Sequence, residues 1–152
     1  MFSTIVGLFL VSDGASVVWY EPPPVDITSD DRIELIADSR QLRKGSTNVQ
    51  LRWSFSVTPV PITIDLTLNG KKIAFVAPLS GDAGPVLGSE GRFNVTWISQ
   101  RATLIIFNVT EDDDGEFGCE LNTFQGGANK IWKRKIKVDV VGKFYFVLFY
   151  SI

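Results

Sequence analysis

Four consecutive acidic residues, Glu111-Asp112-Asp113-Asp114, form the one acidic run in the sequence. Clustered carboxylate oxygens are ligands that Ca²⁺ prefers, so the run could hold a calcium ion or could form a solvated turn. Its spacing lacks the alternation of ligands found in a calcium-binding loop. We therefore favour the turn and predict no metal site.

The histidine that activates the nucleophile in many active sites is missing. The 152 residues include no histidine and one cysteine, Cys119, which excludes Ser-His-Asp triads, Cys-His pairs and histidine-based metal sites. No Gly-x-Ser-x-Gly motif or phosphate-binding loop is present, and Gly126-Gly127 is typical of a tight turn. We expect no enzymatic activity and no cofactor. The single thiol is either buried or pairs with another chain.

A basic stretch near the end of the chain admits two interpretations. It contains Lys130, Lys133, Arg134, Lys135 and Lys137. Such a stretch could bind nucleic acid or heparin. On a strand, however, alternate residues point to opposite faces, and acidic residues of the strand before it could pair with the lysines. We favour this pairing, with Glu116 and Glu120 as the acidic partners, and the net charge of −2 gives a further reason to expect no nucleic-acid partner.

Two sequons for N-linked glycosylation, Asn94-Val-Thr96 and Asn108-Val-Thr110, are present. Both asparagines fall at outward positions of predicted strands. We predict glycans at Asn94 and Asn108.

Alternating apolar and polar residues dominate the middle of the chain. In Val49-x-Leu51-x-Trp53-x-Phe55, every second side chain falls on one face of a strand. Asn69-Gly70 predicts a two-residue hairpin turn. Strands are expected at 33–36, 49–55, 62–68, 71–76, 92–98, 103–107, 116–122 and 132–141, with a loop at 78–90. Short strands at regular spacing, with 45% hydrophobic residues, predict one all-β domain, either a sandwich or a barrel.

The ends of the chain differ in composition from this domain, which we place at 31–141. Residues 1–16 have the apolar run and small residues of a signal peptide, although no Lys or Arg precedes the run. Residues 17–30 form a Pro-rich leader. The apolar tail at 142–152 is too short to span a membrane, and we interpret it as the truncated start of a transmembrane helix or as a fragment boundary.

One stretch carries a family resemblance: Leu104-x-Ile106-x-x-Val109 followed by Asp113-x-Gly115-x-Phe117-x-Cys119. It resembles the E strand, the E–F turn and the Cys-bearing F strand of an immunoglobulin-like domain of variable (V-set) type. The resemblance covers residues 31–141 and implies an antiparallel Greek-key β-sandwich. It also implies a salt bridge between Arg92 and Asp113.

Two departures from the family concern its core. Trp53 stands where the first core cysteine belongs, so the usual disulfide to Cys119 is absent. We expect the indole to fill the space of the missing bridge and to leave Cys119 as a buried thiol. Phe117 replaces the tyrosine of the family's corner motif. The core residues implied are Trp53, Leu104, Ile106, Phe117 and Cys119.

The resemblance implies an extracellular or cell-surface domain for recognition or adhesion that binds another protein, homophilically or heterophilically, with membrane attachment only through an anchor at or beyond the C-terminus. The expected contacts lie on the outer GFCC′ face and in the F–G loop: Thr63, Asp65, Thr67, Glu116, Glu120, Phe124, Gln125, Lys133 and Lys135. Ile105 and Phe107 form a second candidate patch. The alternatives are a structural spacer of a larger receptor or matrix protein and an intracellular scaffold module, which the missing disulfide would suit.

Overall fold

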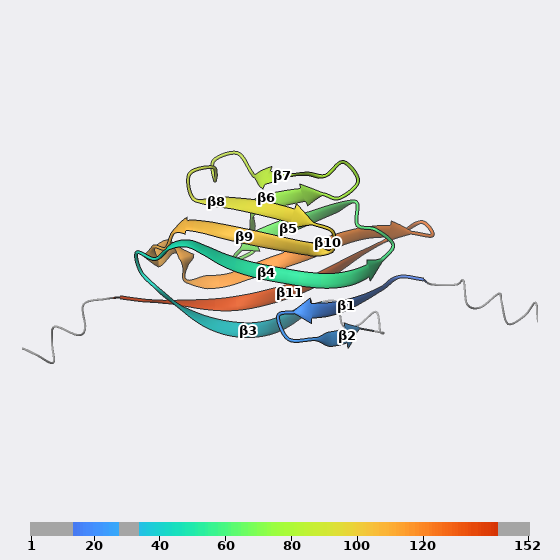
Figure 1. Ribbon diagram of the computed structural model, residues 1–152. Helices are drawn as coiled ribbons and strands as arrows, with labels where there is room; N and C mark the ends of the chain where they lie inside the picture. Colours follow the sequence, from blue (N-terminus) through green and yellow to red (C-terminus); the bar gives the residue numbers. More distant parts are fainter. Residues whose placement is uncertain (1–13, 28–33, 143–152) are drawn as a thin grey trace, which may run out of the picture.

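Two β-sheets face each other in the computed structural model, which describes residues 14–27 and 34–142 (Figure 1). The five-stranded sheet has the order β2 (Val25–Ile27), β1 (Ser16–Glu21), β4 (Thr47–Thr58), β9 (Arg101–Asn108) and β8 (Phe93–Ile98). The six-stranded sheet has the order β3 (Glu34–Arg43), β11 (Ala128–Val141), β10 (Gly115–Gln125), β5 (Thr63–Leu68), β6 (Lys71–Ala77) and β7 (Asp82–Pro85). The β-sandwich prediction is confirmed.

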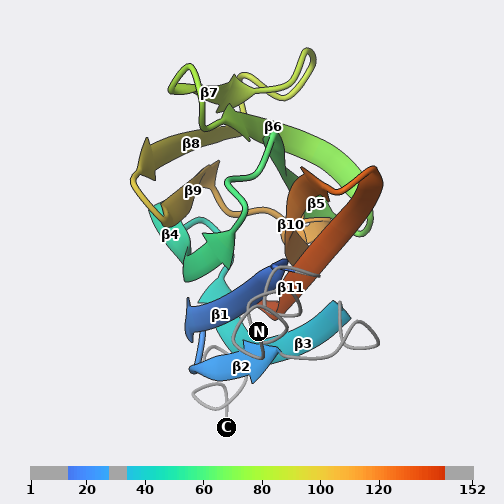
Figure 2. The same ribbon diagram turned by 90° about the vertical axis from the view of Figure 1, so that its right-hand side faces the viewer.

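The strand pairs are antiparallel with one exception among the residues described. β3 runs parallel to β11, in a register that joins Leu35 to Arg134 and Leu42 to Val140. Local alternation carries no information on this pairing, because the two strands are far apart in the sequence. In Figure 2, which looks along the strands, β3 and β11 lie beside the β1–β2 hairpin of the other sheet.

The period-2 pattern of the sequence decides which side chains enter the core. On β4, Leu51, Trp53 and Phe55 are at most 1% exposed, whereas Arg52 between them is exposed. On β10, Phe117, Cys119 and Leu121 are buried with the same period, although Gly118 between the first two is buried as well. Three tryptophans, Trp19, Trp53 and Trp132, are the largest fully buried side chains. The sequence had singled out one of them, Trp53.

The segment predicted as a leader contributes two strands, β1 and β2, to the sandwich. β1 lies within 17–30 except for its first residue, and it pairs with β4 so that Trp19 lies opposite Phe55. Val17 and Trp19 are each 1% exposed, and the Trp19 and Phe55 rings meet edge to face with centroids 5.4 Å apart. The alternation includes only these two apolar residues, Val17 and Trp19. The three prolines that follow, at 22–24, favour an extended leader, so the sequence did not predict the strand.

The hairpin predicted at Asn69-Gly70 joins β5 to β6, and both residues have the positive φ that such a turn requires, 52° and 82°. The loop predicted at 78–90 contains an additional strand, β7, which pairs with β6. β7 holds Gly84 and Pro85 and is half-buried at most, so it has no apolar alternation to reveal it.

The predicted signal peptide, apart from its last three residues, and the apolar tail from residue 143 lie outside the residues described. Within residues 14–27 and 34–142, no helix has the length and apolar character needed to cross a membrane. The described chain enters at one end of the sandwich and leaves at the other (Figure 1).

Candidate protein-binding surfaces

The outer face of the six-stranded sheet carries most of the predicted contact residues. Thr63, Asp65, Glu116, Glu120, Lys133 and Lys135 are all partly exposed there. Their strands are neighbours, with Glu120 opposite Asp65 on one side and Lys133 on the other. The structure thus brings these six residues together on one surface.

Much of the charge on this outer face is paired within the domain. Lys72 Nζ lies 3.1 Å from Asp65 Oδ1, and Lys135 Nζ lies 3.7 Å from Glu116 Oε1. Asn122 Nδ2 donates to Thr63 Oγ1 at 2.9 Å. The alternation predicted on β11 agrees with the burial, since Arg134, Ile136 and Val138 are buried and the lysines between them are not. A partner would have to compete with these contacts, and exposed ion pairs of this kind contribute about 0–1 kcal/mol each.

Thr67 is a correction to the predicted contacts, because it is only 6% exposed. A Cβ at Gly118 on the neighbouring strand would lie 2.7 Å from Thr67 Oγ1 and 3.6 Å from Lys135 Cγ. The threonine side chain therefore sits over the glycine and beside the lysine stem. The strand alternation predicted that Thr67 points outward and is exposed. In the structure the neighbouring side chains cover it. Thr123, in the predicted F–G loop, is likewise buried, and its hydroxyl donates to the Lys130 carbonyl at 2.9 Å.

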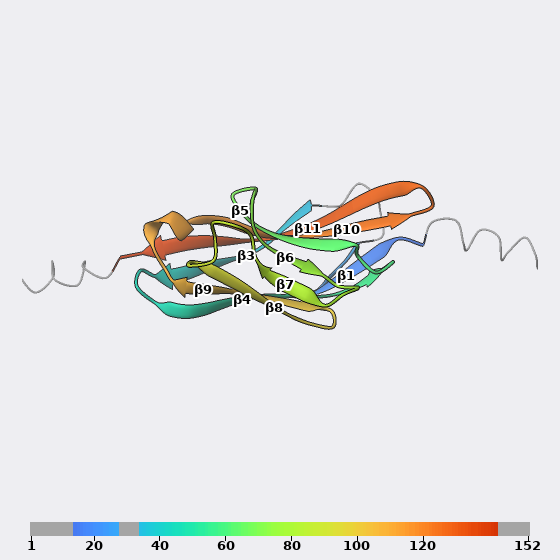
Figure 3. The ribbon, with the colours of Figure 1, turned by 90° about the horizontal axis from the view of Figure 1, so that it is seen from above.

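The strand connections at one end of the sandwich expose large apolar side chains. These connections are β4–β5, β6–β7, β8–β9 and β10–β11, and Figures 1 and 3 show the β10–β11 hairpin projecting at this end. We call this surface the loop end and define it by Val60, Ile62, Leu79, Ile98 and Phe124, which are 50–80% exposed. Gln125, also predicted as a contact, is exposed beside Phe124.

A groove of about 290 Å³ opens at the loop end. Phe55 and Trp97 both line it, and their rings stack with centroids 6.0 Å apart. Its remaining lining residues are Val57, Val60, Pro61, Pro78, Ser99 and Gln100. Of the loop-end residues, the sequence had pointed only to Phe124. Val60 and Leu79 could have been recognised as exposed loop residues, because each is an apolar residue next to Pro or Ser outside any alternating segment.

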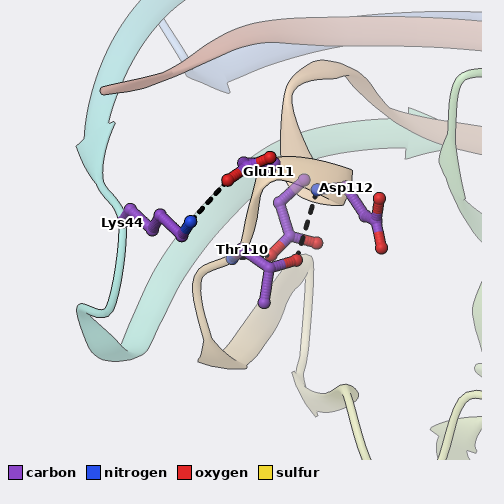
Figure 4. A network of polar contacts seen from close by, with 5 residues as sticks. Lys44, Thr110, Glu111 and Asp112 are labelled. Carbon is purple, nitrogen blue, oxygen red and sulfur yellow. Dashed lines mark hydrogen bonds and ion pairs between the residues drawn. The ribbon is translucent and has the colours of Figure 1, made fainter. Parts of the chain in front are cut away.

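The acidic run forms a short turn, η1 (Glu111–Asp113), at the opposite end of the sandwich (Figure 4). Thr110 caps the turn, and its hydroxyl accepts from the Asp112 amide at 3.2 Å. The Asp113 carboxylate is buried, accepts from the Thr110 amide at 2.8 Å and pairs with Arg92. Lys44 pairs with Glu111, and this hydrogen bond and charge lower the pKa of the Glu111 carboxyl. These contacts make the run a capped turn.

No group of three metal-ligating side chains converges among the residues described. Glu111 pairs with Lys44, Asp113 pairs with Arg92, and Asp114 Oδ2 accepts from the Val140 amide at 2.9 Å. Asp113 is the buried member of the run, and its carboxylate is directed toward Arg92.

The two sequon asparagines lie on the five-stranded sheet. Asn108 is exposed at the end of β9. Asn94 lies on the edge strand β8, is half-buried, and its Oδ1 accepts from the Val95 amide at 2.9 Å. Ile105 and Phe107, the second candidate patch, are half-buried at outward positions of the same sheet.

The predicted core residues Trp53, Leu104, Ile106, Phe117 and Cys119 are each at most 1% exposed. Trp53 Nε1 donates to the Arg134 carbonyl at 3.1 Å and so links the two sheets. Cys119 is a free thiol, and its removal from water raises its pKa well above the usual range, with the negative charges of Glu120 and Asp65 adding to the shift.

Comparisons with known proteins give a fold. The titin M4 structure matches with a TM-score of 0.51 and 18% sequence identity over 72% of this chain and 94% of that chain. The titin M10–obscurin-like 1 Ig complex matches with a TM-score of 0.50 and 12% identity over 86% of this chain and 98% of that one. The fold is immunoglobulin-like. No family model and no curated protein matches the sequence, so the immunoglobulin-like fold is what the comparisons establish.

Proposed function

We propose that this chain is a variable-type immunoglobulin-like domain that recognises another protein through its loop end, without catalysis. The observation that carries the proposal is the gathering of Val60, Ile62, Leu79, Ile98 and Phe124, all at least half exposed, at one end of the sandwich. Exposed apolar side chains gathered on one surface are typical of a protein-binding site, and one of them, Val60, also lines the groove. The variable type is supported by β6 and β7, which extend the sheet of β5, β10 and β11.

Recognition at the loop end would take place by burial of apolar surface. A partner side chain entering the groove would contact Trp97 and Pro61, and each well-buried anchor of this kind contributes about 1–2 kcal/mol or more. The partly exposed charges on the outer face of the six-stranded sheet would form the rim. Rim charges act on the association rate and on specificity more than on affinity.

A pair of matched variants tests the loop end. A tetramerised form of the domain is applied to an array of cells that each display one membrane protein, to find a binder. Leu79→Ser and Phe124→Ser should then weaken that binding by about tenfold or more, corresponding to about 1.4 kcal/mol. Leu87→Ser is the control, because Leu87 is 94% exposed but lies outside the loop end. An equal loss in all three variants, or no loss in any, contradicts the proposal.

We propose a secreted or cell-surface location, which the accessible Asn108 supports. Expression in a eukaryotic secretory host should give glycosylation at Asn108 and, at lower occupancy, at Asn94, whose side chain is half-buried. Mass spectrometry of the tryptic peptides before and after glycosidase treatment measures both sites. Glycans there would cover the five-stranded sheet and leave the other free. Two unmodified asparagines contradict this location.

A spacer or intracellular scaffold module is the second candidate. Two observations favour it: Cys119 is buried without a disulfide, as a reducing compartment permits, and the described chain enters and leaves at opposite ends, as modules in series require. Titin M10 has this fold and was solved in complex with an obscurin-like 1 Ig domain, so such modules also bind proteins. Cytosolic retention of a tagged full chain would favour the intracellular scaffold module, and secretion would exclude that module but not a spacer of a receptor or matrix protein.

A further inference from the structure

A second hollow, of about 410 Å³, opens on the side of the sandwich, where β1 of one sheet approaches β3 of the other. We call it the arginine cleft. Ile136, which is 3% exposed, lies at its floor. Its walls are formed by Tyr20, Glu21, Pro22, Pro23, Arg40, Gln50 and Arg52. Its volume falls in the range of ligand-binding clefts in proteins.

Two arginines of the cleft are positioned by one residue. Arg40 Nη1 donates to the Gln50 carbonyl at 3.0 Å, and Arg52 Nη2 donates to Gln50 Oε1 at 3.1 Å. Both side chains are exposed to solvent. Among the side chains that the structure describes, no carboxylate forms an ion pair with either guanidinium, whereas Lys44, Lys72, Arg92, Arg101 and Lys135 all have one. Two neighbouring cations without an anion repel each other, and a bound carboxylate would relieve that repulsion.

Glu21, the carboxylate on the cleft wall, is already engaged. Its Oε1 accepts from the Ser54 hydroxyl at 2.6 Å and lies 3.8 Å from Arg101 Nε. These contacts hold the carboxylate toward β4 and β9. The free guanidinium donors therefore remain available to an incoming anion.

The proline segment that forms the apolar wall of the cleft is held in place by a hydrogen bond from β11. Arg134, which is 5% exposed, donates from Nη2 to the Pro23 carbonyl at 2.7 Å and ties the proline segment to β11. Tyr20, which is 51% exposed, lines the cleft beside this segment. Tyrosine and proline side chains next to two guanidinium groups suit an extended peptide that carries an acidic side chain.

We propose that the arginine cleft binds an acidic polypeptide segment, with Arg40 and Arg52 holding one of its carboxylates and the Tyr20–Pro23 wall contacting the adjacent residues. A sulfated glycan is the weaker candidate, because a polyanion needs several cations in a row and the chain carries a net charge of −2. The cleft and the loop end are different surfaces, so either site can fail without the other.

The test uses the full chain and a fluorescein-labelled hexapeptide of alternating glutamate and leucine, followed by fluorescence anisotropy at low salt. We expect binding in the high micromolar range, and a matched lysine–leucine peptide should not bind. Replacing both arginines, Arg40→Gln with Arg52→Gln, should weaken binding about tenfold or more. The control, Lys71→Gln with Lys137→Gln, removes the same charge from exposed positions outside the cleft and should change the affinity less than about twofold.

Three results would overturn the proposal. The first is no binding of the acidic peptide below about 1 mM. The second is an equal loss in the two double variants, which would mean that net charge alone attracts the peptide. The third is a heparin hexasaccharide that binds about tenfold tighter than the peptide and loses affinity in the arginine variant, which would assign the cleft to a sulfated glycan. Circular dichroism of each variant checks that the fold is unchanged.

Discussion

At the scale of single residues, folding changes the environment of the Cys119 thiol strongly. It is completely buried, and burial raises its pKa well above the usual range for cysteine. Because the thiolate is the reactive species, Cys119 should resist Ellman's reagent in the native protein and react at once in guanidinium chloride. Absorbance of the released thionitrobenzoate gives both rates, with free glutathione as the control. Rapid labelling of the native protein would show a surface thiol.

The same burial makes stability depend on pH. The folded state disfavours the thiolate, whereas the unfolded thiol ionises above about pH 8.5. This contribution to stability is therefore fully present below that pH and declines as the pH rises above it. Relative to Cys119→Ala, the wild type should lose up to about 1.4 kcal/mol of unfolding free energy per pH unit there. Urea denaturation of both proteins across this window measures the difference, and parallel curves would contradict the prediction.

Trp53 contributes both packing and a hydrogen bond to the core. Its ring is fully buried and its Nε1 donates to the Arg134 carbonyl. Trp53→Phe keeps a ring but leaves that carbonyl without its donor, so we expect a loss of about 1–3 kcal/mol. Trp53→Ala adds a cavity and should cost about 3–5 kcal/mol. Urea unfolding followed by circular dichroism measures both, and half-buried Trp97→Phe, expected to cost below about 1 kcal/mol, is the control.

At the scale of elements, the start of β10 depends on the β5–β6 turn. Asn69 Oδ1 accepts from the Glu116 amide at 3.0 Å, and a Cβ on Gly115 would overlap the Asn69 amide group. Gly115 also has a φ of +152°, which other residues rarely adopt. Gly115→Ala should therefore cost about 2–3 kcal/mol, from the clash and the backbone strain together.

A double-mutant cycle separates the two causes. In the Asn69→Gly background, Gly115→Ala should cost less than in the wild type, by about 1 kcal/mol or more, because the overlapping amide is gone. The remaining cost is the strain of the backbone. Unfolding free energies of the four proteins give the coupling, and a cost that is unchanged by Asn69→Gly would exclude the clash.

Sequence patterns predicted elements whose apolar alternation is long and failed where another constraint decides. β4 places four apolar residues and β10 three in a period-2 pattern, and both strands were predicted. β1 has only Val17 and Trp19 before a proline run, and β7 has no alternation at all. The parallel pairing of β3 with β11 joins distant segments, which a local pattern cannot encode.

The same distinction applies to the candidate sites. Strand parity predicted the outer-face residues, yet parity does not show that Gly118 and Lys135 enclose Thr67. The loop end and the arginine cleft are assembled from connections and strands far apart in the chain, and Val60, Ile98 and Arg52 had no motif to mark them. Such surfaces become visible only when the strands are placed in space.

At the scale of the whole molecule, apolar and charged features are segregated. The loop end exposes aliphatic and aromatic side chains, whereas the opposite end carries the Lys44–Glu111 and Arg92–Asp113 pairs around the capped turn. The arginine cleft lies on the side between the sheets, with two cations that have no carboxylate partner among the described side chains. The two proposed sites therefore differ in the force that would hold a partner.

Salt should separate the two sites. Raising NaCl from about 50 mM to about 500 mM shortens the Debye length from roughly 14 Å to roughly 4 Å, so the acidic peptide should lose about fivefold or more in affinity for the arginine cleft. A partner at the loop end should change its affinity less than about twofold, because burial of apolar surface is not screened. Its binding should instead show a negative heat-capacity change. Titration calorimetry at two salt concentrations and three temperatures measures these quantities on the same protein.

A loop-end partner that shows the salt dependence of the peptide would contradict this prediction. Its binding would then depend on charges of the outer face, such as Glu120 and Lys133, and not on Leu79 and Phe124.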